Sequence, residues 1–317
     1  MTIATKNAHR FFGVALSLGI LLGACGGHSK AVPAAAAAPP APAFAVTDDT
    51  GTKLSLAGPA RRILSLTPGG TEMLFAAGAG GRIIATVQRA DVPEAAKKIP
   101  RVGDATSLDY EKVMNARADV VVAWQDINSA TMIEKLHSLH LPVYLLRATT
   151  LQDIPRSIER LGALAGSAPT AAAAAAELDR KIVALATRQQ PAKPLQVFYQ
   201  IWEGPLYTIG GRHLISNALR LCGARNVFDD LPWPANVVTR DAVVKRDPEI
   251  MLLSAPVLTG REWAGYWNYY PQMQAVANKK IQIWSDERLD RMGPGAIDAV
   301  PALCSTLDEL RGSPAGR

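Results

Sequence analysis

A long alanine-rich segment divides this chain into two runs of alternating strands and helices, and this division restricts the folds that it can adopt. Residues 169–188 contain the run Ala171–Ala176, with Leu178, Ile182 and Leu185 in helical register. Alanine is the strongest helix former, and about 20 residues at 1.5 Å each extend roughly 30 Å. We therefore expect a rigid helix about as long as a domain is wide.

Strand and helix signals alternate on both sides of this segment. Before it, the pattern favours a hairpin at Phe44–Leu56, strands at Arg62–Leu66, Arg82–Val87, Asp119–Trp124 and Pro142–Leu146, and helices at Glu72–Ala77, Leu108–Ala116, Ile127–Leu139 and Asp153–Ala165. After it, strands are expected at Leu195–Trp202, Glu249–Ser254 and Ile281–Ser285, and helices at Leu214–Cys222, Asp241–Arg246 and Gly295–Leu310. Strands that alternate with helices indicate parallel sheets, and hence an α/β fold.

The expected architecture is two β/α lobes, each with a Rossmann-like parallel sheet, joined by the rigid helix. The lobes are expected at residues 44–150 and 191–317, with a helical linker at 151–190. A length of 317 residues fits two domains at about 100–200 residues each. Ligands of such folds bind where the strands end, so we expect a ligand cleft between the lobes.

The first 24 residues have the pattern of a signal peptide. Lys6 and Arg10 precede the apolar run Phe11–Leu22, which is shorter than the roughly 20 residues that span a membrane. The tetrapeptide Leu22-Gly23-Ala24-Cys25 resembles the bacterial lipoprotein cleavage box, which predicts lipidation of Cys25; ordinary signal cleavage is the alternative. Residues 25–43, rich in alanine and proline, would then form a tether. The sequence predicts a periplasmic or extracytoplasmic protein anchored to a membrane.

The charge and composition exclude two broad classes. The apolar fraction is 48%, which rules out a wholly disordered chain. The net charge of +6 falls to +4 when residues 1–24 are removed, because they contain Lys6 and Arg10 and no acidic residue. The chain has no basic run longer than two residues, so nucleic-acid binding is not expected.

Several segments resemble one family in the same order and spacing. Residues 48–78 read DDTGTKLSLAGPARRILSLTPGGTEMLFAAG, with a short hairpin, Pro-x-Arg-Arg-Ile and Ser-Leu-x-Pro-x-x-Thr-Glu. This resembles the start of periplasmic solute-binding proteins of the vitamin B12, haem and siderophore class, which serve ABC importers. The resemblance continues through Asp109–Trp124 and covers nearly all of residues 44–310. It implies two α/β lobes on a rigid helix with little hinge motion.

Within this class the chain is most similar to the cobalamin-binding branch. Leu221-Cys222-Gly223, Asn226-Val227-Phe228 and Leu303-Cys304 carry this similarity. The resemblance implies a disulfide between Cys222 and Cys304; two free buried cysteines are the alternative. It also implies a monomer that binds a corrinoid, delivers it to a permease in the cytoplasmic membrane, and needs no cofactor of its own.

Aromatic side chains at strand ends are the candidate walls of the ligand site. Trp124 ends an expected strand, Trp202 and Tyr207 follow another, and Trp233 lies in an irregular loop. Trp124 and Trp233 match tryptophans that flank the ligand in the cobalamin-binding branch. A tryptophan after a strand can also simply cap the core. The helical spacing of Trp263, Tyr266, Trp267 and Tyr270 instead favours core packing.

The resemblance also predicts two polar ligand contacts, and the sequence differs from the cobalamin-binding branch at two aromatic positions. Asp286 and Arg291 match polar ligand contacts at the base of the cleft, although a solvated charged loop is an equal alternative. Arg89 and Ala105 stand where the cobalamin-binding branch has a tyrosine and a tryptophan. Haem, a ferric siderophore or a modified corrinoid therefore stay possible as ligands.

Two acids match the positions that dock this family onto its permease. Glu111 matches the first docking acid, and Asp241 stands where the second is usually glutamate. Each acid also lies at the start of an expected helix, where a negative charge stabilises the helix without any partner.

No catalytic or metal-binding pattern stands out. His137 and His140 form H-x-x-H without a carboxylate nearby in the sequence, and His213 favours a loop or capping role. The expectation is a binding protein and not an enzyme. The alternatives are an exported enzyme that modifies tetrapyrroles or corrinoids, and a receptor or adaptor without a transport role.

Overall fold

The computed structural model describes residues 44–189 and 191–312. The expected signal peptide (1–24), the tether (25–43) and the lipidation site Cys25 lie outside the described residues. Among the helices in the described ranges, none is both long enough and apolar enough to cross a membrane.

The first half of the described chain forms a hairpin and a parallel sheet. The hairpin pairs β1 (Phe44–Thr47) with β2 (Lys53–Leu56). The sheet has the order β4-β3-β5-β6, with all neighbours parallel. Its strands are β3 (Ile63–Ser65), β4 (Ile83–Ala85), β5 (Val120–Trp124) and β6 (Val143–Leu146). Every residue of β5 is buried, because helices cover both faces of this sheet.

The helices of this lobe alternate with its strands as expected. They are α1 (Pro68–Ala76), α2 (Tyr110–Asn115) and α3 (Ala130–Ser138), with short 3-10 turns at Gly80–Arg82 and Glu94–Lys98. Each of the three helices begins at a capping side chain: Thr67, Asp109 and Ser129 accept hydrogen bonds from the backbone N–H groups of Gly70, Lys112 and Met132. The sequence therefore positions the start of each helix locally.

The second half forms a six-stranded sheet in which a parallel centre is extended by an antiparallel edge. Strand β7 (Leu195–Trp202) is parallel to β11 (Ile250–Ser254) and to β9 (Ala224–Asn226), and β11 is parallel to β12 (Ile281–Trp284). Strand β8 (Tyr207–Ile209) runs antiparallel to β7 and to β10 (Ala235–Val237). The short connection from β7 to β8 permits only this hairpin pairing. The remaining helices are α6 (Leu214–Leu221), α7 (Arg240–Arg246), α8 (Val257–Trp267), α9 (Gln274–Ala277), α10 (Arg288–Arg291) and α11 (Pro294–Gly312).

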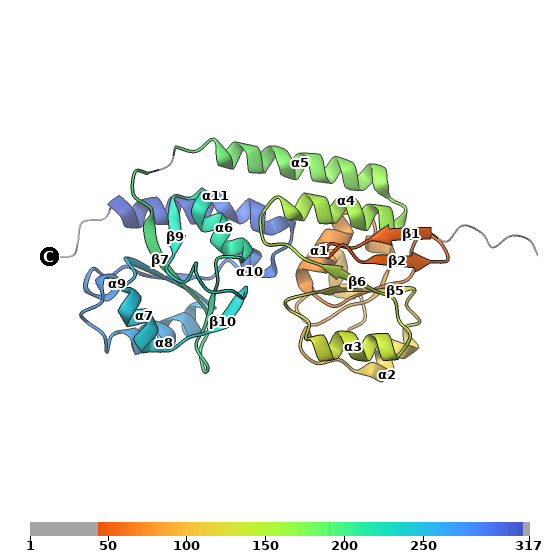
Figure 1. Ribbon diagram of the computed structural model, residues 1–317, viewed down its shortest axis with the longest axis horizontal. Helices are drawn as coiled ribbons and strands as arrows, with labels where there is room; N and C mark the ends of the chain where they lie inside the picture. The colour runs from red at the N-terminus through yellow and green to blue at the C-terminus, as the bar shows by residue number, and fades with distance from the viewer. Residues whose placement is uncertain (1–43, 190, 313–317) are drawn as a thin grey trace, which may run out of the picture. The chain divides into compact units, whose positions relative to one another are not determined.

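Three long helices lie together along one side of the two lobes, with α4 (Asp153–Ala165) over the first lobe (Figure 1). Helix α4 ends at Gly166, which adopts φ 68°, and α5 (Ala168–Ala186) is the expected alanine-rich helix. The two helices approach closely at Gly162, where an added Cβ would lie 2.2 Å from the Cβ of Ala171. Helix α11 packs against α5 and also against α1 and α6, one from each lobe. The C-terminal helix is therefore part of the connection between the lobes.

One apolar core runs through this helical side. It includes Met73 of α1, Ile158 of α4, Ile182 of α5, Leu303 of α11 and Val197 of β7. Two smaller apolar clusters lie elsewhere, one within each lobe. The two lobes are thus separate at their outer sheet faces and share a single core where the helices pack.

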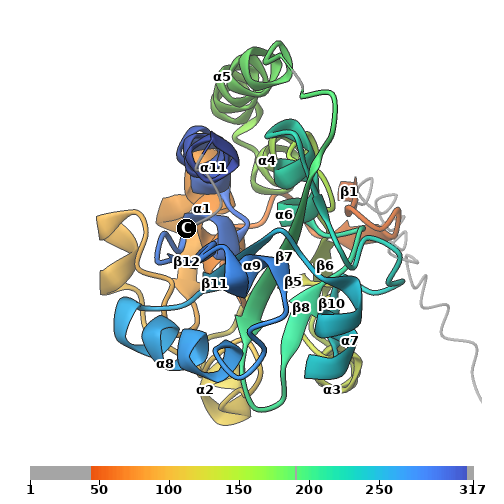
Figure 2. The same ribbon diagram turned by 90° about the vertical axis from the view of Figure 1, so that its left-hand side faces the viewer.

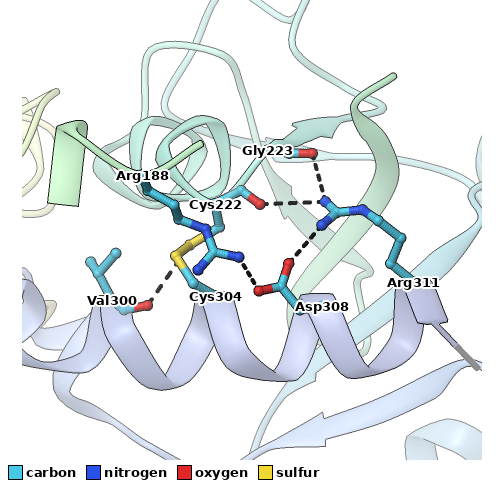
Figure 3. The surroundings of a disulfide bond; sticks show 7 residues. All are labelled: Arg188, Cys222, Gly223, Val300, Cys304, Asp308 and Arg311. Carbon is cyan, nitrogen blue, oxygen red and sulfur yellow. Dashed lines mark hydrogen bonds and ion pairs between the residues drawn. A yellow bond between two sulfur atoms is a disulfide. The ribbon is translucent and has the colours of Figure 1, made fainter. Parts of the chain in front are cut away.

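Cys222 and Cys304 are joined within this core, with their sulfur atoms 1.99 Å apart (Figure 3). The link connects the end of α6 to α11, and both side chains are buried. Beside it, Arg311 donates to the backbone carbonyl of Gly223 at 3.0 Å and to Asp308 at 2.6 Å, and Asp308 also pairs with Arg188. The site ties the second lobe to the long C-terminal helix.

Candidate functional site

A cavity of about 680 Å³ lies where the parallel strands of both sheets end. Its walls include the last residue of four strands: Trp124 of β5, Trp202 of β7, Ser254 of β11 and Trp284 of β12. The first lobe adds Arg89, Asp126, Ile127 and Ala148. The second lobe adds Arg212, His213, Trp263, Glu287 and Asp290, among others. Strand ends from both sheets therefore form this cavity, at the place where the sequence predicts a ligand cleft.

Four of the six tryptophans line this cavity. Trp124 is 2% exposed and forms a wall that is continuous with the core, whereas Trp202 is 59% exposed. Trp202 and Trp263 meet edge to face, with ring centroids 6.4 Å apart and an interplanar angle of 75°. The indole N–H of Trp284 donates to the backbone carbonyl of Asp286 at 3.0 Å, which fixes that ring. Of these four side chains only Trp202 is largely exposed; Trp124, Trp263 and Trp284 are each at most 6% exposed.

The structure separates the residues nominated from the sequence into two groups. Trp124 and Trp202 line the cavity, whereas Tyr207, Trp233, Asp286 and Arg291 are not among its lining residues. Trp233 is 68% exposed, although the adjacent Pro234 belongs to the cavity wall. Tyr207 lies at the start of the edge strand β8, which pairs with β10.

Asp286 and Arg291 are engaged by other protein groups. Asp286 is held by the guanidinium of Arg288 at 2.5 Å. The Nε of Arg291 donates to the carboxylate of Glu72 at 2.7 Å, and Glu72 is a buried residue of α1 in the other lobe. Burial raises the pKa of Glu72, and the charge of Arg291 opposes this rise. Arg291 therefore joins the two lobes beneath the cavity.

A close backbone contact accompanies this ion pair. A Cβ added at Gly69 would lie 2.0 Å from the carbonyl oxygen of Arg291. The first turn of α1 can approach the end of α10 only because residue 69 has no side chain. Arg291 is directed toward Glu72 by packing between residues more than 200 positions apart, which no local sequence pattern reveals.

The cavity also contains residues that the sequence reasoning missed. Trp263 was expected in the core; it is buried among apolar residues and yet also contributes to the cavity wall. Trp284 ends a strand as Trp124 does, so the same signal could have found it. Glu287 and Asp290 belong to the charged stretch that contains Asp286 and Arg291, and that stretch alone does not show which side chains turn inward.

The two departures from the cobalamin-binding branch differ in their consequences. Arg89 lies in the cavity wall with a positive φ of 64°, and its guanidinium pairs with the carboxylate of Glu287 at 3.0 Å. This ion pair links a loop of the first lobe to a loop of the second. Ala105 is not a lining residue; its carbonyl accepts a hydrogen bond from the side chain of Asn128 at 2.9 Å.

Two titratable groups in the cavity have strongly shifted pKa values. Burial lowers the pKa of His213 to about 4, so the imidazole is neutral at pH 7. Its Nδ1 accepts the N–H of Ile215 at 3.1 Å and caps α6, which leaves the hydrogen of the neutral ring on Nε2. Burial raises the pKa of Asp290 to about 6. His213 thus offers the cavity a neutral N–H donor, and Asp290 offers a carboxyl group whose pKa lies near 6.

The two expected docking acids occupy equivalent positions in the two lobes. Glu111 is the second residue of α2, and Asp241 is the second residue of α7; both are exposed. Each precedes the first residue of the buried strand β5 or β11 by nine positions. Figures 1 and 2 both show α2 and α7 on the side of the molecule away from α5.

Within the described ranges there is no group of three or more histidine, cysteine or acidic side chains that could hold a metal ion. His137 is the eighth residue of α3, and His140 follows the helix in a left-handed conformation with φ 59°. The polar side chains of the cavity can form hydrogen bonds to a ligand.

Known proteins share this sequence pattern and fold. The profile of a family described as periplasmic binding protein matches residues 63–286. A protein named vitamin B12-binding protein from Pectobacterium atrosepticum is 31% identical over 261 residues, which cover 80% of this chain and 91% of that protein.

Solved structures extend the comparison to the fold. The periplasmic vitamin B12 binding protein BtuF of Vibrio cholerae is 28% identical, with a TM-score of 0.70 over 80% of this chain and 99% of that chain. The periplasmic haem binding protein HutB of Vibrio cholerae has a TM-score of 0.64 at 18% identity, over 78% of this chain and 98% of that one. At that identity the likeness to HutB concerns the fold alone.

Proposed function

The chain belongs to the periplasmic binding protein family, and from this membership we propose that it binds cobalamin outside the cytoplasm and delivers it to the permease of an ABC importer. The observation that carries the proposal is the cavity at the strand ends, with four tryptophans around a few polar groups. The names of the relatives point the same way: vitamin B12-binding protein in Pectobacterium atrosepticum and BtuF in Vibrio cholerae.

The chemistry of the cavity fits a corrinoid. A corrin ring has two flat apolar faces and an edge of amide side chains, so its binder needs aromatic walls and hydrogen-bonding groups. Trp202 supplies an exposed aromatic surface against the buried Trp263, and Trp124 lines the cavity from the opposite lobe. His213 and Asp290 offer a donor and an acceptor for amide groups.

A titration of the purified protein with cyanocobalamin tests the proposal directly. We expect a Kd well below 10 μM, which corresponds to a binding free energy more favourable than about −7 kcal/mol. Trp202→Ala should weaken binding about tenfold, because it removes an exposed stacking wall. Tyr269→Ala is the matched control, because Tyr269 is 83% exposed in the same lobe and does not line the cavity.

Two results would contradict the proposal. Binding weaker than 10 μM by wild-type protein would exclude cobalamin as the physiological ligand, and tight binding of haemin or a ferric siderophore in parallel titrations would reassign it within the family. Equal losses for Trp202→Ala and Tyr269→Ala would place the ligand outside the cavity.

We also propose that the protein is an exported lipoprotein that acts as a monomer. Residues 1–24 would direct export, the cysteine at 25 would carry the lipid, and residues 25–43 would hold the binding unit away from the membrane. We expect wild-type protein in the membrane fraction of cells and Cys25→Ser in the soluble exported fraction. Equal membrane retention of both would contradict lipid anchoring at Cys25.

A further inference from the structure

Asp290 presents its carboxylate to the cavity from the short helix α10. The hydroxyl of Ser254 donates to one carboxylate oxygen at 2.5 Å, and the hydroxyl of Tyr199 donates to the other at 3.2 Å. Ser254 ends β11 and Tyr199 lies in β7, so the two central strands of the second sheet hold the carboxylate. Each oxygen keeps a lone pair available for a ligand.

Asp290 forms no ion pair with the charged side chains around the cavity in the part of the chain that the structure describes. Among the residues that line the cavity, the carboxylates are Asp126, Glu287 and Asp290, and the guanidiniums are Arg89 and Arg212. Arg89 pairs with Glu287 at 3.0 Å. Arg291, next in sequence to Asp290, pairs with Glu72 at 2.7 Å and with Glu287 at 3.7 Å. No ion pair within the described ranges includes Asp290.

We infer that Asp290 determines ligand specificity by accepting N–H groups from an amide-edged ring and repelling a ring whose edge carries carboxylates. The inference rests on the proposed function and narrows it. An amide N–H can complete the free lone pairs of the carboxylate, whereas a ligand carboxylate would bring a like charge against it. Discrimination by such a repulsive contact can exceed what attraction alone provides.

The surroundings of Asp290 also predict how capture depends on pH. Burial raises its pKa to about 6, the hydroxyls of Ser254 and Tyr199 oppose this, the charge of Glu287 adds to it, and that of Arg89 reduces it. His213 is neutral above pH 5 and contributes no charge there. If the ligand binds only the ionised form, affinity is full at pH 8, falls to about half at pH 6 and decreases further below it. At pH 5 the loss should be about tenfold relative to pH 8.

Two corrinoids that share the same ring and differ in the groups around its edge test the inference. Dicyanocobinamide carries amides around the ring, and dicyanocobyrinic acid carries carboxylates. At pH 8 we expect wild-type protein to bind the amide form at least 100-fold more tightly. Asp290→Asn should weaken binding of the amide form about tenfold, strengthen binding of the acid form about tenfold, and remove most of the loss between pH 8 and pH 5 for the amide form. The pH series uses only the amide form, because the acid form itself titrates.

Further variants separate this role from a structural one. Asp230→Asn, at an exposed acid paired with Arg246 outside the cavity, should leave both affinities unchanged. Ser254→Ala should leave affinity at pH 8 nearly intact while moving the pH midpoint upward, because it removes a hydrogen bond that lowers the pKa of Asp290. A merely structural Asp290 would not produce that shift. Thermal unfolding of each variant confirms that it is folded.

The outcomes distinguish the inference from the proposed function. If wild-type protein binds cyanocobalamin tightly but Asp290→Asn keeps the wild-type preference between the two corrinoids, the role of Asp290 is wrong and the proposed function stands. A larger change in preference for Asp286→Asn than for Asp290→Asn would also overturn it. If wild-type protein binds no corrinoid, both the role of Asp290 and the proposed function are wrong.

Discussion

Replacing Glu111 and Asp241 together with arginine is expected to abolish ligand uptake through the importer while leaving ligand affinity unchanged. Both acids are exposed at the second position of equivalent helices, one in each lobe. If they pair with arginines of the permease, as the family resemblance implies, reversal turns two attractions into repulsions, each costing several kcal/mol. Uptake of labelled cobalamin by intact cells should fall more than 100-fold.

A double variant with the same charge change serves as the control. Glu159→Arg with Asp179→Arg alters exposed acids of α4 and α5, the helices on the opposite side of the molecule, and should leave uptake near the wild-type rate (Figure 1). Asp241→Glu lengthens the shorter acid by one methylene and should raise uptake or leave it unchanged. Equal loss of uptake in both double variants, or a parallel loss of ligand affinity, would show that these acids do not dock.

Removing the proposed disulfide is expected to lower the free energy of unfolding by about 4 kcal/mol. Cys222 and Cys304 are separated by 82 positions, and closing a loop of that length restricts the unfolded chain by roughly this amount. Cys222→Ala combined with Cys304→Ala should show the loss in denaturant unfolding of the exported protein. Peptide mass spectrometry of the unreduced wild-type protein should find the two cysteines linked.

Reduction provides the control for this measurement. Wild-type protein treated with reductant should lose nearly as much stability as the double variant, whereas the double variant should not respond to reductant. A stability difference below 1 kcal/mol, or separate peptides for the two cysteines without reduction, would mean that they pack as free buried thiols.

Local patterns predicted the elements that carry the fold. Strand β7 begins and ends where the apolar run indicated, and α5 follows the alanine segment almost residue for residue. The pattern missed β8, β9 and β10, which have three residues each. Such short segments become strands only because β7 or a neighbour offers them hydrogen bonds, and that pairing is decided by tertiary structure.

The site was predictable only in part, for a similar reason. Trp124 and Trp202, which the sequence nominated, line the cavity because strand ends of parallel sheets converge there; their contact with a ligand stays a prediction. The charged stretch Ser285–Arg291 was also found, but its members divide between cavity and core through contacts with distant residues. Arg291 turns to Glu72 and Asp290 turns to Ser254, and neither partner is near in the sequence.

The single apolar core behind the cavity has a thermodynamic consequence for capture. A hinge closure of the two lobes would separate α1, α5 and α11 and expose buried apolar surface. The free-energy cost of that exposure is about 25 cal/mol for each Å². We therefore expect the buried rings of Trp124, Trp263 and Trp284 to be in place before a ligand binds. Little conformational entropy is lost on binding, so most of the stacking and hydrogen-bond energy appears directly as affinity. We expect the shared helical core to limit movement of the lobes, so that a few side chains suffice to bind a ligand.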